Sequence, residues 1–243
     1  MVNPYLMHRR KAFRGQPSPL LTNLVAWYRL DEASGNALDA HTGAYHLTQN
    51  GTVGTATGKV SGARSFDANS SNFLSQSGSQ FNFGNTTFYG AQWIYSGNTN
   101  TAIIHGVWDD GVGANRQWFL FQDASRYRFG ITSDGLFGAG NGLTVAWGSN
   151  FAINTWHLVE FYHNAATDLI GIAVNNGAFV TGSFNKGIYV GASTPYRVGR
   201  GANNSAPLAW NGRLDEVAIW SRMLTTDERA TLWNSGNGIG YSA

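Results

Sequence analysis

Cysteine is absent from this sequence of 243 residues, and charged residues make up only 12% of it. Without cysteine, the chain can form neither disulfides nor thiolate metal sites. No stretch approaches the roughly 20 consecutive apolar residues that a membrane-spanning helix needs, so we expect no membrane insertion. No apolar run of roughly 7–15 residues follows the basic N-terminus, so no secretory signal is recognised. The sequence therefore predicts a soluble chain without an export signal.

Glycine is abundant, with 31 residues, and hydrophobic residues make up 42% of the chain. Short runs rich in aromatic and β-branched residues, typical of strands, alternate with polar, glycine-rich turns. Asn176-Gly177 predicts a two-residue hairpin turn, which needs positive φ at both positions. We expect strands at 23–30, 86–95, 116–123, 126–132, 155–163, 169–174, 178–184 and 212–220. With no long helix and no internal repeat, the pattern indicates an all-β fold.

The last expected strand, 212–220, carries two adjacent acids, Asp215 and Glu216. Side chains alternate between the two faces of a strand, so these carboxylates should point in opposite directions and should not share a substrate. The same alternation places Val217 and Ile219 with Asp215, and Leu214, Ala218 and Trp220 with Glu216.

A short helix is expected after this strand. Thr225 and Glu228 have the spacing of a capping box, and Gly236 is a candidate for the helix end. A helix of roughly two to three turns is too short to be stable alone. We therefore expect it to dock on the sheet through Leu224, Leu232 and Trp233.

Four segments resemble, in order, the LamG-like jelly-roll domains of the concanavalin A-like lectin/glucanase superfamily. They are LVAWYRLDEASGNALDAHTG (24–43), GKVSGARSFDA (58–68), NTWHLVEFYHNAATDLIGIAVNNG (154–177) and GRLDEVAIWSRMLTTDE (212–228). The resemblance implies a two-sheet antiparallel jelly-roll sandwich over residues 21–243, with one short C-terminal helix. Residues 1–20 match nothing in the family and should form an extended basic arm. Two departures, Leu158 in place of a frequent His and Asn175 in place of a frequent Asp, affect positions that contact ligands or ions in other members.

Catalytic motifs are missing from the sequence. Some relatives in this superfamily are glycoside hydrolases, which need paired carboxylates on one strand face. The chain has only four glutamates, and none lies in such a motif. We therefore predict that the protein is not an enzyme, with a glycosidase acting through Glu160 as the least favoured alternative.

Calcium is the one cofactor that the resemblance suggests, because the family often binds a structural Ca²⁺ between its opening loop and its closing strand. The matching residues are Asp39 and Asp215, whose oxygens suit a hard cation. The alternative is that Asp215 caps a turn and Asp39 forms an Asx-turn.

Carbohydrate binding is suggested by tryptophans near glycine-rich turns, since aromatic faces stack on sugar rings. The loop 105–118 combines an aromatic, two acids, an amide and a guanidinium. The candidate carbohydrate-binding residues are Trp108, Asp109, Asp110, Asn115, Arg116 and Trp147. The alternative is a surface loop with one aromatic packed beneath it.

The N-terminal arm carries four of the chain's basic residues within its first fourteen positions. Nucleic-acid binding is not favoured, because four charges without a folded basic face bind phosphates weakly. The residues that could attach the arm to another surface are Tyr5, Arg9, Arg10, Lys11, Phe13 and Arg14.

A lectin-like body with an attachment arm and no export signal is typical of phage virion proteins. We therefore expect a non-enzymatic virion component that contacts other virion or capsid proteins, its own copies and a glycan. The alternative is a free carbohydrate-binding module, with or without calcium.

Overall fold

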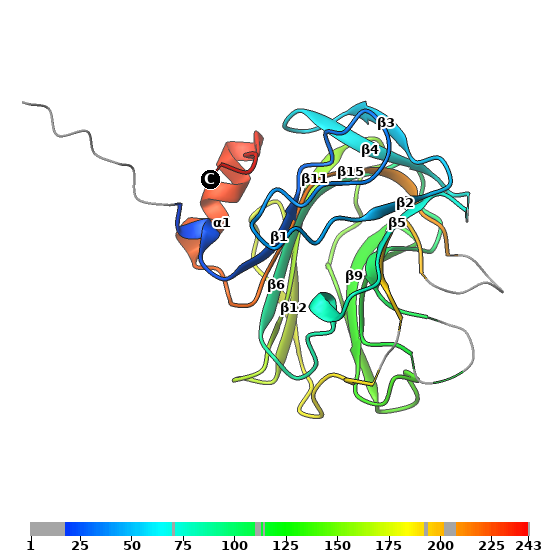
Figure 1. Cartoon of the computed structure of the whole chain (residues 1–243). Helices are drawn as coiled ribbons and strands as arrows, with labels where there is room; N and C mark the ends of the chain where they lie inside the picture. Colours follow the sequence, from blue (N-terminus) through cyan, green and yellow to red (C-terminus); the bar gives the residue numbers. More distant parts are fainter. Residues whose placement is uncertain are drawn as a thin grey trace, which may run out of the picture.

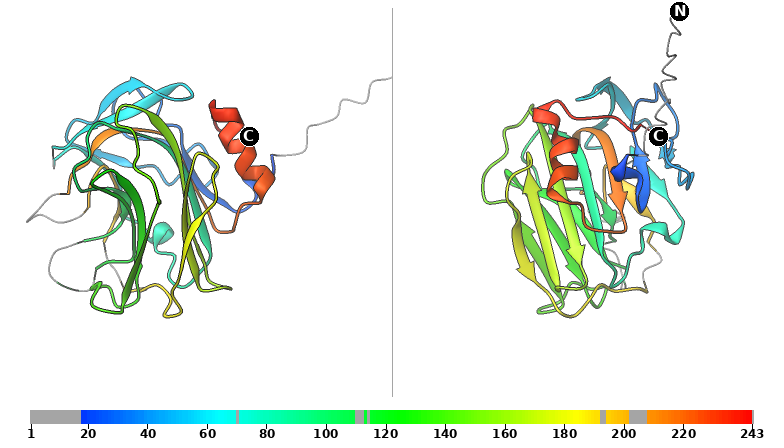
Figure 2. Two further views of the ribbon diagram at one scale, coloured as in Figure 1. Left: turned by 180° about the vertical axis from the view of Figure 1, so that it is seen from behind. Right: turned by 90° about the vertical axis from the view of Figure 1, so that its left-hand side faces the viewer.

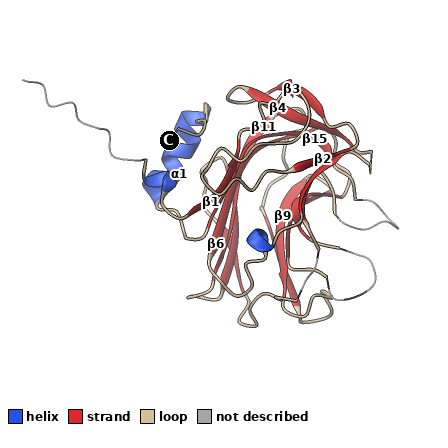
Figure 3. Ribbon diagram, in the orientation of Figure 1, coloured by secondary structure: helices blue, strands red, loops and turns tan. Residues whose placement is uncertain are grey.

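The computed structural model describes residues 18–69, 71–109, 113, 115–191, 194–201 and 208–242. These residues form two antiparallel β-sheets packed face to face, with a short helix near the C-terminus (Figure 1, Figure 3). The predicted jelly-roll sandwich and its C-terminal helix are confirmed. Within the described ranges, no helix has the length and apolar character needed to cross a membrane.

The first sheet carries the helix on its outer face. Its strands, in spatial order, are β13 (Val180–Ser183), β12 (Leu169–Val174), β11 (Trp156–Asn164), β6 (Phe88–Ser96), β15 (Asn211–Trp220), β4 (Gly62–Asp67) and β3 (Gly54–Thr57). In addition, β1 (Leu24–Tyr28) pairs with β15.

The second sheet closes the other side of the sandwich. Its order is β10 (Gly142–Ala146), β9 (Arg126–Thr132), β8 (Trp118–Asp123), β7 (Ala102–Val107), β14 (Tyr196–Val198), β5 (Phe73–Gln76) and β2 (Thr48–Asn50). Three short 3₁₀ turns complete the structure: η1 (Pro19–Leu21), η2 (Ser79–Phe81) and η3 (Asn234–Gly236).

The core between the sheets is dominated by aromatic rings. Trp118 is fully buried and stacks on Phe161 and Tyr196, with ring centroids 5.7 Å apart in both pairs. Buried His105 also lies in this core. Its Nε2 forms a hydrogen bond with Gln92 Oε1, and its Nδ1 forms one with the Tyr196 hydroxyl. The loop expected at 105–118 therefore begins later than predicted, because residues 105–107 complete β7.

Helix α1 (Thr226–Trp233) lies across the outer face of the first sheet (Figure 2). The predicted capping box is present, with the Thr225 side chain accepting from the Glu228 N–H and Glu228 accepting from the Thr225 N–H. The helix ends at Asn234, in the left-handed region at φ 45°, two residues before the predicted Gly236. Trp233 stacks on Trp93 of β6 at 5.5 Å, so the predicted docking through Trp233 is confirmed.

The hairpin turn after β12 lies one residue earlier than predicted. Asn175 and Asn176 take φ values of 55° and 57°, and the Gly177 N–H donates to the Val174 carbonyl at 3.0 Å. Asparagine tolerates this left-handed region better than most residues. The two central residues are therefore Asn175 and Asn176, instead of Asn176 and Gly177.

The N-terminal arm meets the body at η1. Leu20 is buried, and its carbonyl accepts from the Trp220 indole at 2.7 Å. Arg222 donates to the carbonyls of Pro19 and Thr22. Pro19 and Leu20, which we expected in the arm, are thus bound to the body beside α1. Burial of the apolar Leu20 side chain in the cluster that contains Trp220 is favourable in free energy. The six predicted attachment residues (Tyr5, Arg9, Arg10, Lys11, Phe13 and Arg14) lie outside the described residues.

Candidate functional site

The opening loop after β1 forms a hollow on the surface. Leu30 is buried in the sandwich core and holds a left-handed conformation at φ 63°. Such a conformation is strained for leucine and persists only where the surrounding structure imposes it. With Leu30 anchored, Arg29 and Asp31 on either side lie exposed at the surface.

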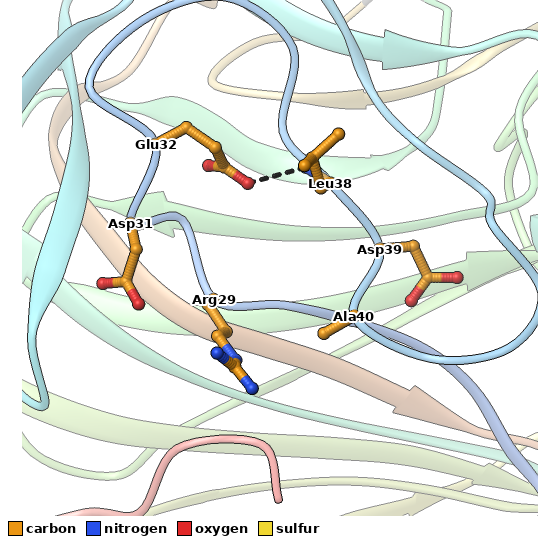
Figure 4. Close-up of a pocket in the computed structure, with 6 residues that line it drawn as sticks. All are labelled: Arg29, Asp31, Glu32, Leu38, Asp39 and Ala40. Atoms are coloured by element: carbon orange, nitrogen blue, oxygen red, sulfur yellow. Dashed lines mark hydrogen bonds between the residues drawn. The ribbon is translucent and has the colours of Figure 1, made fainter. Parts of the chain in front are cut away.

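We call this feature the opening-loop hollow: a space of about 400 Å³ lined by Arg29, Asp31, Glu32, Leu38, Asp39 and Ala40. Figure 4 shows Arg29, Asp31 and Glu32 around it, with Leu38 and Ala40 on the returning chain. Glu32 Oε1 accepts from the Leu38 N–H at 2.7 Å and joins the two sides of the loop. Its other oxygen, Oε2, is buried and has no hydrogen-bond partner among the described residues.

Two further contacts fix side chains that line the hollow. Asp31 Oδ1 accepts from the Gly62 N–H at 2.6 Å, which ties the loop to β4. Arg29 donates to the Tyr241 carbonyl at 2.9 Å and lies over its ring at 5.7 Å. The C-terminal segment therefore holds the guanidinium of Arg29 at the edge of the hollow.

Asp215 and Glu216 lie on the same face of the sheet, which corrects the prediction from strand alternation. Asp215 pairs with Trp93 and Ala218 with Ala91, so β15 has one extra residue between these pairs. Glu216 takes φ 51° in this β-bulge, and bulges of this kind redirect side chains. Glu216 accepts from the indole N–H of Trp27 on the outer face of the sheet. Asp215 lies on the same face, opposite Trp93.

These two carboxyls are hard to ionise where they lie. Burial raises the pKa of Asp215 to about 7 and that of Glu216 to about 8. These pKa values include a smaller raising effect of the negative charge of Asp31 on both groups and of Asp215 on Glu216, and the lowering effect of hydrogen bonds from backbone amides to Asp215 and from Trp27 to Glu216. The bulge therefore brings two carboxyls that resist ionisation close to Asp31.

The two predicted calcium ligands have other partners. Asp39 Oδ1 accepts from the N–H groups of Trp27 and His41, and its Oδ2 accepts from the Tyr45 N–H. In Figure 4 its carboxylate is turned away from Asp31.

Asp215 is held separately. Its Oδ2 accepts from the N–H groups of Lys59 and Val60 and so caps the β3–β4 turn. Its Oδ1 is buried and has no hydrogen-bond partner in the part of the chain that the structure describes. The described residues contain no group of three or more His, Asp or Glu that could hold a metal ion. These contacts agree with the turn-and-cap alternative. Calcium binding stays a prediction.

The predicted carbohydrate loop brings three of its candidates together. Trp108 packs against Phe119 and Phe137, with centroid distances of 3.8 and 5.2 Å, and Arg116 lies over its indole at 5.4 Å. Arg116 also donates to the Asp109 carbonyl at 3.1 Å. Trp108 is only 5% exposed, so its ring cannot stack on a sugar unless a neighbour moves.

The other candidate carbohydrate-binding residues are Asn115, Asp110 and Trp147. The Asn115 carbonyl accepts from the Thr194 hydroxyl at 2.9 Å, and Asp110 lies outside the described residues. Trp147 follows the far end of β10, where its N–H donates to the Tyr127 carbonyl, and it packs against the sandwich core. The structure therefore separates Trp147 from Trp108.

Glu160, the candidate of the glycosidase alternative, is fully buried in an ion pair. Arg229 of α1 donates to Oε1 at 3.0 Å and to Oε2 at 2.9 Å, and the Tyr89 hydroxyl donates to Oε1 at 2.6 Å. Both carboxylate oxygens are therefore occupied by groups that fasten the helix to the sheet.

The sequence did not lead us to Arg29 and Glu32 as lining residues of the hollow, or to the position of Glu216 on the same face as Asp215. Arg29 had the pattern of an ordinary outward-facing strand residue, and no local signal marked the bulge at Glu216. Glu32 did carry a signal, since it lies in the Asp-Glu-x-x-Gly segment that resembles the family's opening loop. A closer reading of that segment would have found it.

Comparison with protein families places residues 67–228 in the concanavalin A-like lectin/glucanases superfamily. A search of curated protein sequences found no match to this chain.

Several solved structures share the fold at low sequence identity. The binding domain of Paraclostridial Mosquitocidal Protein 1 is 16% identical, with a TM-score of 0.70, and the match covers 89% of this chain and 53% of that one. The binding domain of botulinum neurotoxin DC in complex with SialylT is 14% identical, with a TM-score of 0.58. That match covers 89% of this chain and 52% of the toxin domain. The chain thus spans about half the length of these toxin binding domains.

A third similar structure matches over nearly its full length. It is domain 4 of AbnA, a GH43 extracellular arabinanase from Geobacillus stearothermophilus, in complex with arabinotriose. It is 16% identical, with a TM-score of 0.59, and the match covers 85% of this chain and 96% of that one. At these identities the likeness establishes the fold.

Proposed function

The chain belongs to the concanavalin A-like lectin/glucanases superfamily, and we propose that it is a non-enzymatic carbohydrate-binding domain whose ligand occupies the opening-loop hollow. Two of the similar structures are complexes with arabinotriose and with SialylT, which supports a saccharide as the class of ligand. The sandwich supplies a rigid body, and the loops at its edge supply the recognition groups.

The observation that carries the proposal is the set of polar groups around the hollow. Glu32 lines the hollow with a carboxylate that is held in place by the hydrogen bond from the Leu38 N–H to its Oε1. Asp31 adds a second carboxylate and Arg29 a guanidinium donor. Carboxylates accept from sugar hydroxyls and guanidinium groups donate to them, so a polyhydroxylated ligand satisfies this set.

The absence of catalysis is part of the same proposal. Retaining glycosidases need one carboxylate free to attack and a second free to transfer a proton. Here Glu160 is paired with Arg229, while Glu216 is 5% exposed and accepts from Trp27. Asp215 is fully buried behind the β3–β4 turn. None of these three carboxyls is open to a substrate without rearrangement.

A glycan array of the wild-type chain, followed by calorimetry on the strongest ligand, tests the proposal. Glu32→Gln and Asp31→Asn keep the hydrogen bonds to the Leu38 and Gly62 amides but remove the charge. We expect each to weaken binding about tenfold or more. Arg116→Gln in the predicted loop 105–118 is the matched control and should bind as the wild type does. Absence of any glycan ligand would refute the proposal, and a loss confined to Arg116→Gln would move the site to that loop.

We also propose that the domain serves as a virion component attached through its N-terminal arm. Support comes from the basic run at residues 9–14 and from the contacts that fix η1 beside α1. These contacts hold Pro19 and Leu20, the end of the proposed arm, on the body. The partners would be other virion or capsid proteins and further copies of this chain.

A further inference from the structure

A second hollow, of about 230 Å³, lies on the first sheet away from the opening loop. It is formed at the end of β6, the start of β15 and the middle of β4. Its polar lining comes from Ser65, Tyr95, Asn154, Asn211 and Arg213. It contains no acidic residue among its lining groups, in contrast to the opening-loop hollow.

Cross-strand register aligns four side chains beside this space. Trp156 of β11 pairs with Tyr95 of β6, Tyr95 pairs with Arg213 of β15, and Arg213 pairs with Ser65 of β4. Residues that pair in this way share one face of a sheet. We call these four residues the sheet-face row.

Helix α1 ends before it reaches the sheet-face row. Its last residue, Trp233, stacks on Trp93, two residues before Tyr95 on the same face of β6. Tyr95, Trp156 and Arg213 are therefore only partly buried, whereas Trp93 is 2% exposed. The row forms an open platform at the end of the helix.

The groups of the platform are preorganised but have unused hydrogen-bonding capacity. The Arg213 guanidinium lies over the Tyr95 ring at 4.6 Å, and the rings of Tyr95 and Trp156 are 5.4 Å apart. Across the described ranges, neither the Arg213 guanidinium nor the Asn154 amide has a hydrogen-bond or ion-pair partner. A cation held flat on an aromatic ring loses little freedom when it binds a ligand.

We infer that this second hollow binds a sugar ring that carries a carboxylate. Arg213 matches a carboxylate through two parallel N–H groups. The apolar surface of Trp156 suits the face of a pyranose, and the amides of Asn154 and Asn211 suit its hydroxyls. A neutral sugar would leave the charge of Arg213 unpaired, so the carboxylate is the selected feature. This site is independent of the opening-loop hollow, where Asp31 and Glu32 disfavour an anion.

Methyl β-glucuronide and methyl β-glucoside form a matched pair of probes, because they differ only in the carboxylate. In NMR titrations of the full chain, glucuronide should shift the indole N–H of Trp156, and glucoside should bind at least tenfold more weakly. Arg213→Gln should weaken glucuronide binding about tenfold or more, and Arg213→Lys should keep part of it. Asp31→Asn should leave glucuronide binding unchanged.

Unfolding midpoints confirm that each variant is folded before binding is compared. Failure of glucuronide to bind the wild type, or equal affinity of wild type and Arg213→Gln, would overturn the inference. Loss of glucuronide binding in Asp31→Asn alone would also overturn it and would assign the acidic sugar to the opening-loop hollow. The first two of these three results do not bear on glycan binding by the opening-loop hollow through Glu32, which is tested separately.

Discussion

Removing Arg229 should loosen helix α1 far more than its position near the chain end suggests. Arg229 pairs with Glu160 through two hydrogen bonds, donates to the Gly177 carbonyl at 2.8 Å and lies over the Phe179 ring at 4.3 Å. The side chain of Arg229 is 13% exposed and that of Glu160 is 0% exposed. The pair therefore behaves as a buried ion pair.

The expected loss of stability follows from the carboxylate that remains. Breaking a buried pair by removing one partner costs about 3–5 kcal/mol, because the other charge stays buried without compensation. Arg229→Met keeps much of the packing over Phe179 and isolates the charge. The double variant Arg229→Met with Glu160→Gln removes both charges and should recover part of the loss.

Urea unfolding of the wild type, both single variants and the double variant measures this coupling. The exposed pair of Arg128 and Asp123, 3.0 Å apart with side chains 30% and 40% exposed, is the matched control. Its removal through Arg128→Met should cost less than about 1 kcal/mol. The reasoning fails if Arg229→Met costs no more than this control, or if the double variant is as unstable as the sum of the single ones.

Three further predictions concern protons, calcium and assembly. Burial lowers the pKa of His105 to about 3, so the unfolded chain takes up a proton below about pH 6.5 while the folded chain does not. The stability cost of His105→Gln in urea unfolding should therefore shrink by up to about 1.4 kcal/mol per pH unit from pH 6.5 down; a cost independent of pH would contradict this. The calcium prediction requires a chelator to lower the thermal midpoint of the wild type but not that of Asp215→Asn; an unchanged midpoint in both would contradict calcium binding and leave Asp215 as a turn cap. Deletion of residues 1–17, which spares buried Leu20, should give a folded monomer in native mass spectrometry, while the full chain associates; identical masses for both would refute an attachment arm.

The overall architecture was predictable because its signals are local. The hairpin and the capping box depend on residues close together in the sequence, and each expected strand run contains a strand. Short strands such as β3 (Gly54–Thr57) were not predicted, because a segment of glycine, threonine and alanine without large apolar residues has the composition of a turn.

The site was less predictable because long-range packing decides it. The bulge at Glu216 appears only when β15 is paired with β6. Trp108 had the sequence context of an open platform, but Phe119 and Phe137 cover it from other strands and loops. Arg229 and Glu160 are 69 residues apart, and nothing in either segment indicates the other.

The most direct test of carbohydrate recognition is to map the strongest array ligand on the protein by NMR. The opening-loop hollow predicts that the amide signals of Leu38 and Ala40 shift on titration, since Leu38 donates to Glu32 at the wall of the hollow. Glu32→Gln should need at least about tenfold more ligand to reach the same shifts. Shifts confined to residues 115–118, or unchanged shifts in Glu32→Gln, would contradict the proposed site.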